Sequence, residues 1–412
     1  IDFGYRAVHL TTAAGKALTR AYYGTDPEYS YFEGCSTGGR QGLMEAQRYP
    51  DDFDGIVAGA PVNYYQALNA SRMWLMQQVY ANDLEASLTV DTTGDGQPDS
   101  DRKLVMLAEQ VMAACDGVDG VTDGVINDPT RCDFTPARDL ADMMCLDNVN
   151  RDNCFTHAQL ALIETLYAGT HDSAGTLVYQ GKPFGSERGW RARLFPHPSN
   201  NFTPGNFGIA GDHLNYIFYE DDPGVTIPDL TDVSIQPNRA RNPPEWSWQE
   251  FDIDDMTNGK ADLLMSIMDA SDPDLTRFLM RNNGKLLLYH GWNDVMTVAP
   301  ATIDYYDQVV ETTFDGDIDA AKERARLFLA PGMGHCRGDV GPDSWDRLAP
   351  LVEWVEHGRA PDAIIASHST NGSVDNERPL CPYPDQAVYT GPLGGENNSE
   401  NWVAQNFSCR KP

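Results

Sequence analysis

The residues best suited to chemistry in this 412-residue sequence are a serine, an aspartate and a histidine, each followed or preceded by small residues. Ser36 lies in the pattern Gly34-Cys-Ser-Thr-Gly38, whose glycines permit a sharp strand-to-helix turn that exposes the hydroxyl. The N-terminus of the following helix favours developing negative charge. The same pattern occurs by chance in unrelated loops, so the segments on either side of it decide whether Ser36 is a nucleophile. A strand-like segment, 29–33, precedes Ser36 and a helix-like segment, 39–49, follows it, so we interpret Ser36 as a nucleophile.

A serine hydroxyl needs a base, and the base needs a carboxylate that orients it. Asp294 follows the apolar segment 285–289, and His335 follows the apolar segment 325–330. Both therefore lie in loops at the carboxyl ends of predicted strands, where the functional groups of open α/β sheets collect. The chain order serine, aspartate, histidine is that of an α/β-hydrolase triad. We predict that Asp294 orients His335 and that His335 activates the serine.

The elements that must position these residues alternate in type. Strand 29–33, helix 39–49 and strand 56–58 form a βαβ unit, and the later segments repeat this alternation. The later elements are strand 285–289, helix 299–310, strand 325–330 and helix 348–356. We predict an α/β fold: an α/β-hydrolase core with a large inserted lid domain.

The boundaries of these two parts follow from composition. The core is built from residues 1–63 and 284–412. Residues 64–283 are rich in Asp, Asn, Pro, Gly and aromatic side chains, with predicted helices at 70–81 and 104–114, and they form the lid. Six lid aromatics are candidates for a flat substrate slot, with core packing as the alternative for each: Trp190, Phe195, Phe202, Phe207, Trp246 and Trp248.

The charge of the chain excludes two classes of partner. It has 61 acidic and 30 basic residues, a net charge of −31. Such a surface repels nucleic acid and anionic membranes, and we expect neither as a partner. No apolar run is long enough for a membrane-spanning helix.

The eight cysteines favour disulfides, and hence a secreted or periplasmic protein. Zinc is the alternative, but no paired-cysteine or cysteine–histidine spacing typical of zinc sites occurs. Cys35 precedes Ser36 and Cys336 follows His335. If the triad forms, these two sulfurs must be close, so we predict a Cys35–Cys336 disulfide.

An Asp-Gly-rich segment is a candidate Ca²⁺ site. Carboxylates of Asp116, Asp119 and Asp123 and carbonyls of Val121 and Val125 would form an oxygen cage, and a solvated turn is the alternative. A second acidic loop, at 91–99, matches only the first half of an EF-hand loop, and we leave a second Ca²⁺ open. No organic cofactor is expected.

Taken together, these segments resemble the tannase and feruloyl esterase family, which includes mono(2-hydroxyethyl) terephthalate hydrolase. Matching segments are spread over almost the whole chain and are specific as a set. They are FGYRAVH, YFEGCSTGGRQGLMEAQRYPDDFDGIVAGAP, CDGVDGVTDGVINDPTRC, GKLLLYHGWND and PGMGHC. The resemblance implies the triad Ser36, Asp294 and His335, the Cys35–Cys336 disulfide and the Ca²⁺ ligands Asp116, Asp119, Val121, Asp123 and Val125 in the lid. It also implies the disulfides Cys115–Cys132, Cys145–Cys154 and Cys381–Cys409.

The resemblance further implies an oxyanion hole with two donors. One is the backbone N–H of Thr37, and the other comes from an early loop of the family that these 412 residues do not contain. Losing one donor typically costs about 10²–10³ in turnover. Either the early part of the core that carries this loop was removed or lies on a separate piece, or this chain is a compromised enzyme.

The expected substrate is a small aromatic ester, free or attached to a plant polysaccharide or polyphenol. Hydroxycinnamoyl (feruloyl) esters rank first, gallate esters second and terephthalate monoesters third. His290 and Trp292, close to Asp294, are candidate substrate contacts, and His290 is also an alternative base. Two other classes remain open: a non-catalytic binding relative without a complete oxyanion hole, and a calcium-stabilised structural module.

Overall fold

The computed structural model describes residues 1–219 and 248–411, which divide into two compact units. The first unit contains Ile1–Tyr65, Asp116–Arg131 and Met265–Pro412, and the second contains Gln66–Cys115 and Cys132–Leu264. Among the lid aromatics, Trp246 lies outside the described residues.

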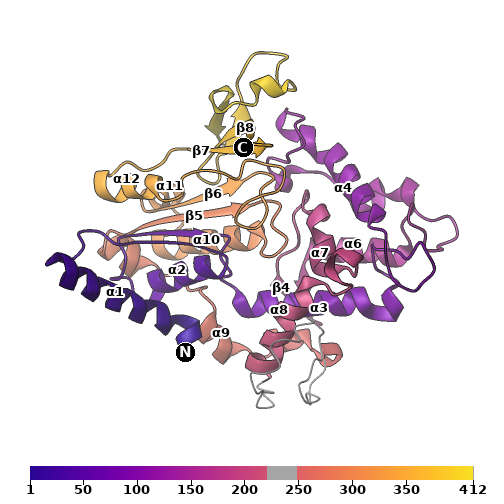
Figure 1. Cartoon of the computed structure of the whole chain (residues 1–412), viewed down its shortest axis with the longest axis horizontal. Helices are drawn as coiled ribbons and strands as arrows, with labels where there is room; N and C mark the ends of the chain where they lie inside the picture. Colours follow the sequence, from indigo (N-terminus) through magenta and orange to yellow (C-terminus); the bar gives the residue numbers. More distant parts are fainter. Residues whose placement is uncertain (220–247, 412) are drawn as a thin grey trace. The chain divides into compact units, whose positions relative to one another are not determined.

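The first unit is built on a four-stranded parallel sheet with strand order β1-β2-β5-β6 (Figure 1). The strands are β1 (Tyr31–Cys35), β2 (Gly55–Gly59), β5 (Lys285–Gly291) and β6 (Ala325–Ala330). All four predicted strands are confirmed, with small shifts at their ends. Because the strands are parallel, the loops after β1, β5 and β6 leave the same edge of the sheet.

Four helices of the first unit pack on the sheet: α2 (Thr37–Arg48), α10 (Ala299–Phe314), α11 (Ile318–Lys322) and α12 (Ala349–His357). The helix α1 (Ala7–Tyr23), which has no buried residue, contacts α2. The helix predicted at 348–356 ends at Gly358, whose φ of 69° is a left-handed conformation that glycine adopts without steric cost.

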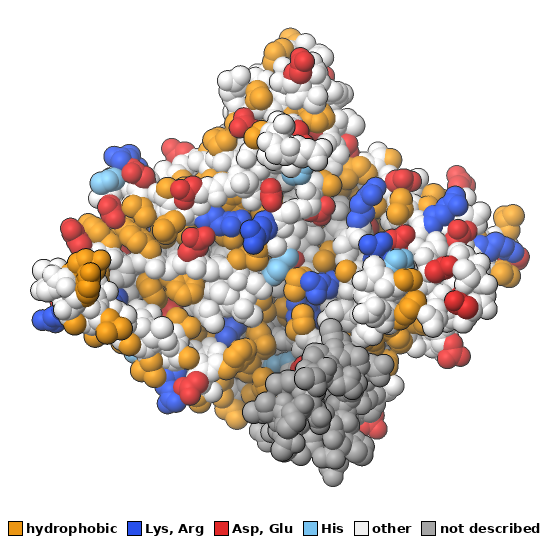
Figure 2. Space-filling view, in the orientation of Figure 1, with side chains coloured by type: hydrophobic (Ala, Val, Ile, Leu, Met, Phe, Trp, Pro, Cys, Tyr) orange, Lys and Arg blue, Asp and Glu red, His pale blue; other side chains and the backbone are white. Residues whose placement is uncertain are grey.

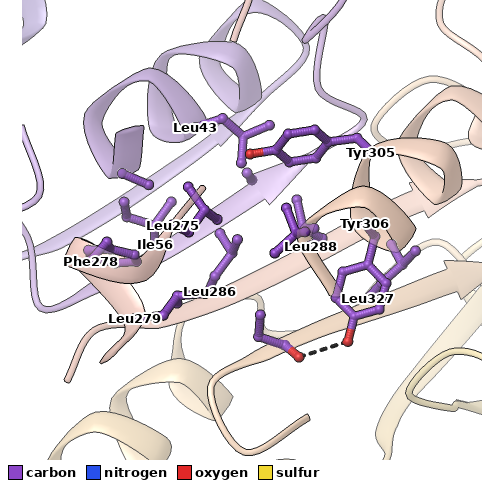
Figure 3. Packing of buried hydrophobic residues seen from close by; sticks show 14 of the residues in the cluster. Leu43, Ile56, Leu275, Phe278, Leu279, Leu286, Leu288, Tyr305, Tyr306 and Leu327 are labelled. Atoms are coloured by element: carbon purple, nitrogen blue, oxygen red, sulfur yellow. Dashed lines mark hydrogen bonds between the residues drawn. The ribbon is translucent and has the colours of Figure 1, made fainter. Parts of the chain in front are cut away.

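The main apolar cluster joins α2 and α10 to the middle strands (Figure 3). Leu43 from α2, Ile56 from β2 and Leu288 from β5 are fully buried in it. Tyr306 of α10 is buried as well, and its hydroxyl donates to the carbonyl of Ala325 at 2.9 Å. This packing fixes α2, and therefore the turn at its N-terminus, against the sheet.

Two antiparallel strand pairs complete the first unit. They are β7 (Ile364–Thr370) with β8 (Ser373–Leu380), and β9 (Gln386–Tyr389) with β10 (Phe407–Arg410). Ile364 and Leu380 pack with Trp354 of α12 in a second apolar cluster, so the β7–β8 pair belongs to the same folded body as the sheet.

The second unit is mainly helical, with one short strand pair. Its elements are α3 (Tyr65–Tyr80), α4 (Arg102–Cys115), α5 (Pro136–Asp139), α6 (His157–Ala168), α7 (Trp190–Leu194), α8 (Gly205–His213), β3 (Thr170–His171) and β4 (Leu177–Tyr179); α9 (Asp262–Met268) crosses the boundary between the units. Trp190, Phe195 and Phe207 are buried in this unit, so for these three aromatics core packing is the observed role.

The predicted lid, 64–283, is longer than the second unit. Residues 116–131 belong to the first unit because Arg378 of β8 pairs with Asp119 and Asp123. Residues 265–283 also belong to it, because apolar side chains such as Phe278 pack into the main cluster. The assignment of the candidate Ca²⁺ loop to the lid was therefore wrong.

Acidic side chains are scattered over the face seen in Figure 2 and do not form one patch. In the described part of the chain, no helix is both long and apolar enough to cross a membrane.

Candidate functional site

Ser36 lies in a strained turn between β1 and α2. Its φ of 63° and ψ of −123° are values that a non-glycine residue adopts only when the surroundings impose them. A Cβ atom on Gly34 would lie 2.6 Å from the backbone of Gly38, and one on Gly39 would lie 2.4 Å from the carbonyl oxygen of Gly59. Gly34 and Gly39 are thus required by close backbone approach, whereas a Cβ atom on Gly38 would meet nothing within 4 Å.

Thr37, the predicted oxyanion donor, is the first residue of α2. The N–H groups of a helix's first turn have no partner within the helix and point toward its N-terminal end. The Ser36 amide itself donates to Gly59 at 2.9 Å, which ties the turn to β2.

Asp294 and His335 come together at the carboxyl ends of β5 and β6. The Nδ1 atom of His335 donates to Oδ2 of Asp294 at 2.7 Å. Because a carboxylate only accepts, this bond places the ring proton on Nδ1 and leaves Nε2 as an acceptor. The imidazole is therefore in the tautomer that a general base requires. His335 is part-exposed, whereas Asp294 is fully buried.

Five hydrogen bonds surround the Asp294 carboxylate. Its Oδ1 accepts from the amides of Met296 and Thr297 at 2.8 and 3.1 Å. Its Oδ2 accepts from the Thr297 hydroxyl at 2.7 Å, from His335, and from Nε2 of His290 at 3.1 Å. Burial alone would raise the pKa of Asp294, but the bonds and charge of the two histidines outweigh burial and hold the pKa well below its usual range. Asp294 is therefore ionised at all ordinary pH values.

His290, a predicted substrate contact and alternative base, has a different place. It is fully buried, and both ring nitrogens are engaged, Nε2 by Asp294 and Nδ1 by the Thr302 hydroxyl at 2.8 Å. The expectation of substrate contact at His290 was wrong, because the residue supports the carboxylate from within the core. Thr297 and Thr302 were missed. The position of Thr297 three residues after Asp294, a spacing typical of Asp-centred turns, is the signal that points to it.

A disulfide joins the turn at Ser36 to the loop at His335. Cys35 and Cys336 are bonded, with their Cα atoms 6.0 Å apart. The carbonyl of Cys336 also accepts from Arg347 at 2.7 Å, and this guanidinium stacks over the rings of Tyr289 and Trp345. The bridge predicted from the geometry of the triad is confirmed, and Arg347 adds a second restraint that the sequence did not indicate.

The other predicted pairs, Cys115–Cys132, Cys145–Cys154 and Cys381–Cys409, are also confirmed, and no cysteine is free.

Trp292 is buried and lines a cavity of about 240 Å³ within the first unit. Neither Ser36 nor His335 is among the described residues that line it. A substrate contact at Trp292 remains a prediction.

The candidate Ca²⁺ loop lies against β8. Fully buried Arg378 pairs with Oδ2 of Asp119 at 3.4 Å and with Oδ2 of Asp123 at 2.5 Å. Asp116 accepts from the amide of Gly124 at 3.1 Å. Burial is the main cause that raises the pKa of both Asp116 and Asp119. Three carboxylates against one guanidinium leave a net charge of about −2, which a divalent cation would balance.

The donor set thus fits Ca²⁺ in charge and chemistry, since hard oxygen ligands are what this ion prefers. Val121 and Val125 are buried beside the carboxylates. The carboxylate oxygens of these three aspartates do not all lie within 4.8 Å of one another, so a bound ion would have to draw them closer.

The other acidic loop, at 91–99, already has internal partners. In it, Asp91 accepts from the amides of Thr93, Gly94 and Gly96.

Comparison with known proteins agrees with this architecture. The profile of the family described as "Tannase and feruloyl esterase" matches residues 1–409. Mono(2-hydroxyethyl) terephthalate hydrolase from Piscinibacter sakaiensis is 34% identical, over 100% of this chain and 68% of its own length. A probable feruloyl esterase B-2 from Aspergillus terreus is 31% identical, over 97% of this chain and 70% of its own length.

Solved structures give the same result. Feruloyl esterase B from Aspergillus oryzae superposes with a TM-score of 0.80 at 25% identity, covering 99% of this chain and 74% of its own. Tannin acyl hydrolase from Aspergillus niger, at 23% identity and a TM-score of 0.74, shares the fold over 100% of this chain and 70% of its own.

Fold and site define a hydrolase with an α/β-hydrolase-like core. The chain belongs to the tannase and feruloyl esterase family, and it is a carboxylic ester hydrolase.

Proposed function

We propose that the protein is a serine esterase that hydrolyses aromatic carboxylic esters through Ser36, His335 and Asp294 and an acyl-enzyme. The observation that carries the proposal is the hydrogen bond between His335 and Asp294, on a loop that a disulfide ties to the serine turn. This arrangement supplies an oriented base on a loop that is bonded to the turn of a strained, part-exposed nucleophile.

In the proposed mechanism, Nε2 of His335 takes the proton of the Ser36 hydroxyl as the oxygen attacks the ester carbonyl. Asp294, ionised and buried, stabilises the imidazolium that forms. The backbone N–H of Thr37 donates to the oxyanion. The imidazolium then gives its proton to the leaving alcohol or phenol, and water, activated by the same histidine, hydrolyses the acyl-enzyme.

The acyl group proposed first is hydroxycinnamoyl, and gallate is second. The names of the feruloyl esterase relatives support this order. A terephthalate monoester is the alternative, supported by the relative of that name at 34% identity. Polysaccharide- or polyphenol-linked esters are the natural forms we propose for the first two. The disulfides support export to an oxidising compartment.

A substrate comparison tests the proposal. Turnover of methyl ferulate, methyl gallate and mono(2-hydroxyethyl) terephthalate is measured for the wild type and for Ser36→Ala, with Ser199→Ala, on an exposed turn of the second unit, as the control. We expect kcat/KM to be highest for methyl ferulate and to fall by about 10⁴ or more in Ser36→Ala alone. Hydrolysis that survives in Ser36→Ala would refute the proposed nucleophile.

We further propose a structural Ca²⁺ held by Asp116, Asp119 and Asp123 and the carbonyls of Val121 and Val125. The uncompensated charge of about −2 on the three carboxylates of this part-buried loop supports it. When bound, the ion would neutralise the carboxylates. Arg378 holds Asp119 and Asp123 in place, and the backbone amide of Gly124 holds Asp116.

A further inference from the structure

A second group of potential ligands lies in the first unit, on the helices next to the N-terminus. His9 of α1, Glu45 of α2 and Asp52 after α2 bring one ligand atom each within 4.8 Å of the others. It is the one such group of three that the described residues contain. None of these residues has a part in the proposed mechanism.

Glu45 makes this group unusual. Its side chain is 1% exposed, and in the described structure neither carboxylate oxygen accepts a hydrogen bond from an N–H or hydroxyl donor. Burial and the neighbouring Asp52 carboxyl raise the pKa of Glu45 to about 8. A buried carboxylate without donors is costly, because the charge has lost its water and gained nothing in return. Its neighbour Asp52 is another carboxylate, and the repulsion between the two charges is relieved by a shared proton, by a protonated His9 or by a metal ion.

The other side chains of the group are already held in place. His9 turns Nδ1 toward Oδ2 of Asp52, at 2.6 Å, and its ring stacks on Tyr49 with centroids 3.9 Å apart. Lys16 donates to the backbone carbonyl of Asp52, not to its carboxylate. The His9 and Asp52 side chains remain 32% and 14% exposed, so an ion can enter from solvent while Glu45 closes the inner side.

We infer that His9, Glu45 and Asp52 form a binding site for a divalent transition-metal ion such as Zn²⁺. One imidazole nitrogen and two carboxylate oxygens are ligands of this borderline class, whereas Ca²⁺ and Mg²⁺ prefer oxygen alone. Exposure on one side leaves the remaining coordination positions to water. The ion would join α1 to α2 and to the segment that leads into β2, so its role is structural.

Zn²⁺ binding to the whole protein tests the site. The protein is stripped with EDTA, returned to excess Ca²⁺, and titrated with Zn²⁺ by calorimetry, with thermal unfolding as the second readout. We expect one Zn²⁺ per chain and a higher unfolding midpoint with Zn²⁺. We also expect at least a tenfold higher Kd in Glu45→Gln, which keeps the shape of the side chain but removes its charge.

Further variants keep the result interpretable. His9→Gln, at a part-exposed position that tolerates the change, should weaken Zn²⁺ binding as Glu45→Gln does. Glu28→Gln and His357→Gln, both exposed, serve as matched controls and should bind like the wild type, as should Asp116→Asn in the calcium loop. Zn²⁺ binding that is absent, or unchanged in Glu45→Gln and His9→Gln, overturns the inference; absent binding would mean that a shared proton or a protonated His9 relieves the repulsion between Glu45 and Asp52.

Discussion

Replacing Asp294 by asparagine tests how this site holds its histidine. The asparagine oxygen should face the amides of Met296 and Thr297, because both donate to Oδ1. The side-chain NH₂ then takes the place of Oδ2 and donates to Nδ1 of His335. That nitrogen must become an acceptor, so the ring proton moves to Nε2. In this tautomer the imidazole has no lone pair for the proton of Ser36.

The expected loss follows from two missing contributions, the correct tautomer and the charge that stabilises the imidazolium. Together they are worth about 10⁴ in kcat in serine hydrolases of this design, which is about 5.5 kcal/mol of transition-state stabilisation. KM should change by no more than about threefold, since Asp294 is fully buried and contacts no substrate.

The assay is steady-state hydrolysis of the best substrate, with Asp315→Asn as a control. Asp315 is exposed and has φ 52°, a conformation that asparagine tolerates, so this variant should keep full activity. Circular dichroism and the unfolding midpoint establish that Asp294→Asn is folded. A folded Asp294→Asn enzyme with more than about a tenth of wild-type kcat would refute the reasoning.

Three further results are expected. The double variant Cys35→Ser/Cys336→Ser should lose turnover and up to about 5 kcal/mol of stability, because the bridge closes a very long loop; unchanged denaturant midpoints would contradict this. EGTA should lower the unfolding midpoint of the wild type but not of Asp123→Asn, and equal responses would exclude Ca²⁺ there. Burial lowers the pKa of His213 from 6.5 to about 4, so the unfolded chain binds the extra proton and stability falls as pH drops through this window. The free energy of unfolding should fall by about 3 kcal/mol between pH 6.5 and pH 4. This fall should be absent in His213→Gln, and identical pH profiles of the unfolding free energy for the wild type and the variant would disprove it.

Three strands of the sheet, β2, β5 and β6, were predictable from sequence because each is a short, largely apolar run followed by a loop of small and polar residues, and β1 was predictable from its aromatic residues before the glycine-rich turn. Segment 325–330 matches β6 at both ends, and the predicted loop positions of Asp294 and His335 agree with the structure. The local sequence pattern is sufficient to predict a strand where that strand is buried on both faces and bounded by glycine or proline.

Contacts between distant segments were not predictable. Arg378, more than 250 residues from Asp119 and Asp123, holds the candidate Ca²⁺ loop on the first unit, and nothing in local composition indicates that partner. His290 similarly looks like any polar residue at a strand end. Its burial becomes evident only when α10 places Thr302 beside it.

The Cys35–Cys336 bridge also changes what cutting the chain can do. The two cysteines are 301 residues apart, and two other disulfides lie within that span. A single proteolytic cut anywhere inside the span leaves both fragments covalently joined beside the serine and the histidine. Nicked molecules would therefore migrate as one intact species until a reducing agent is added.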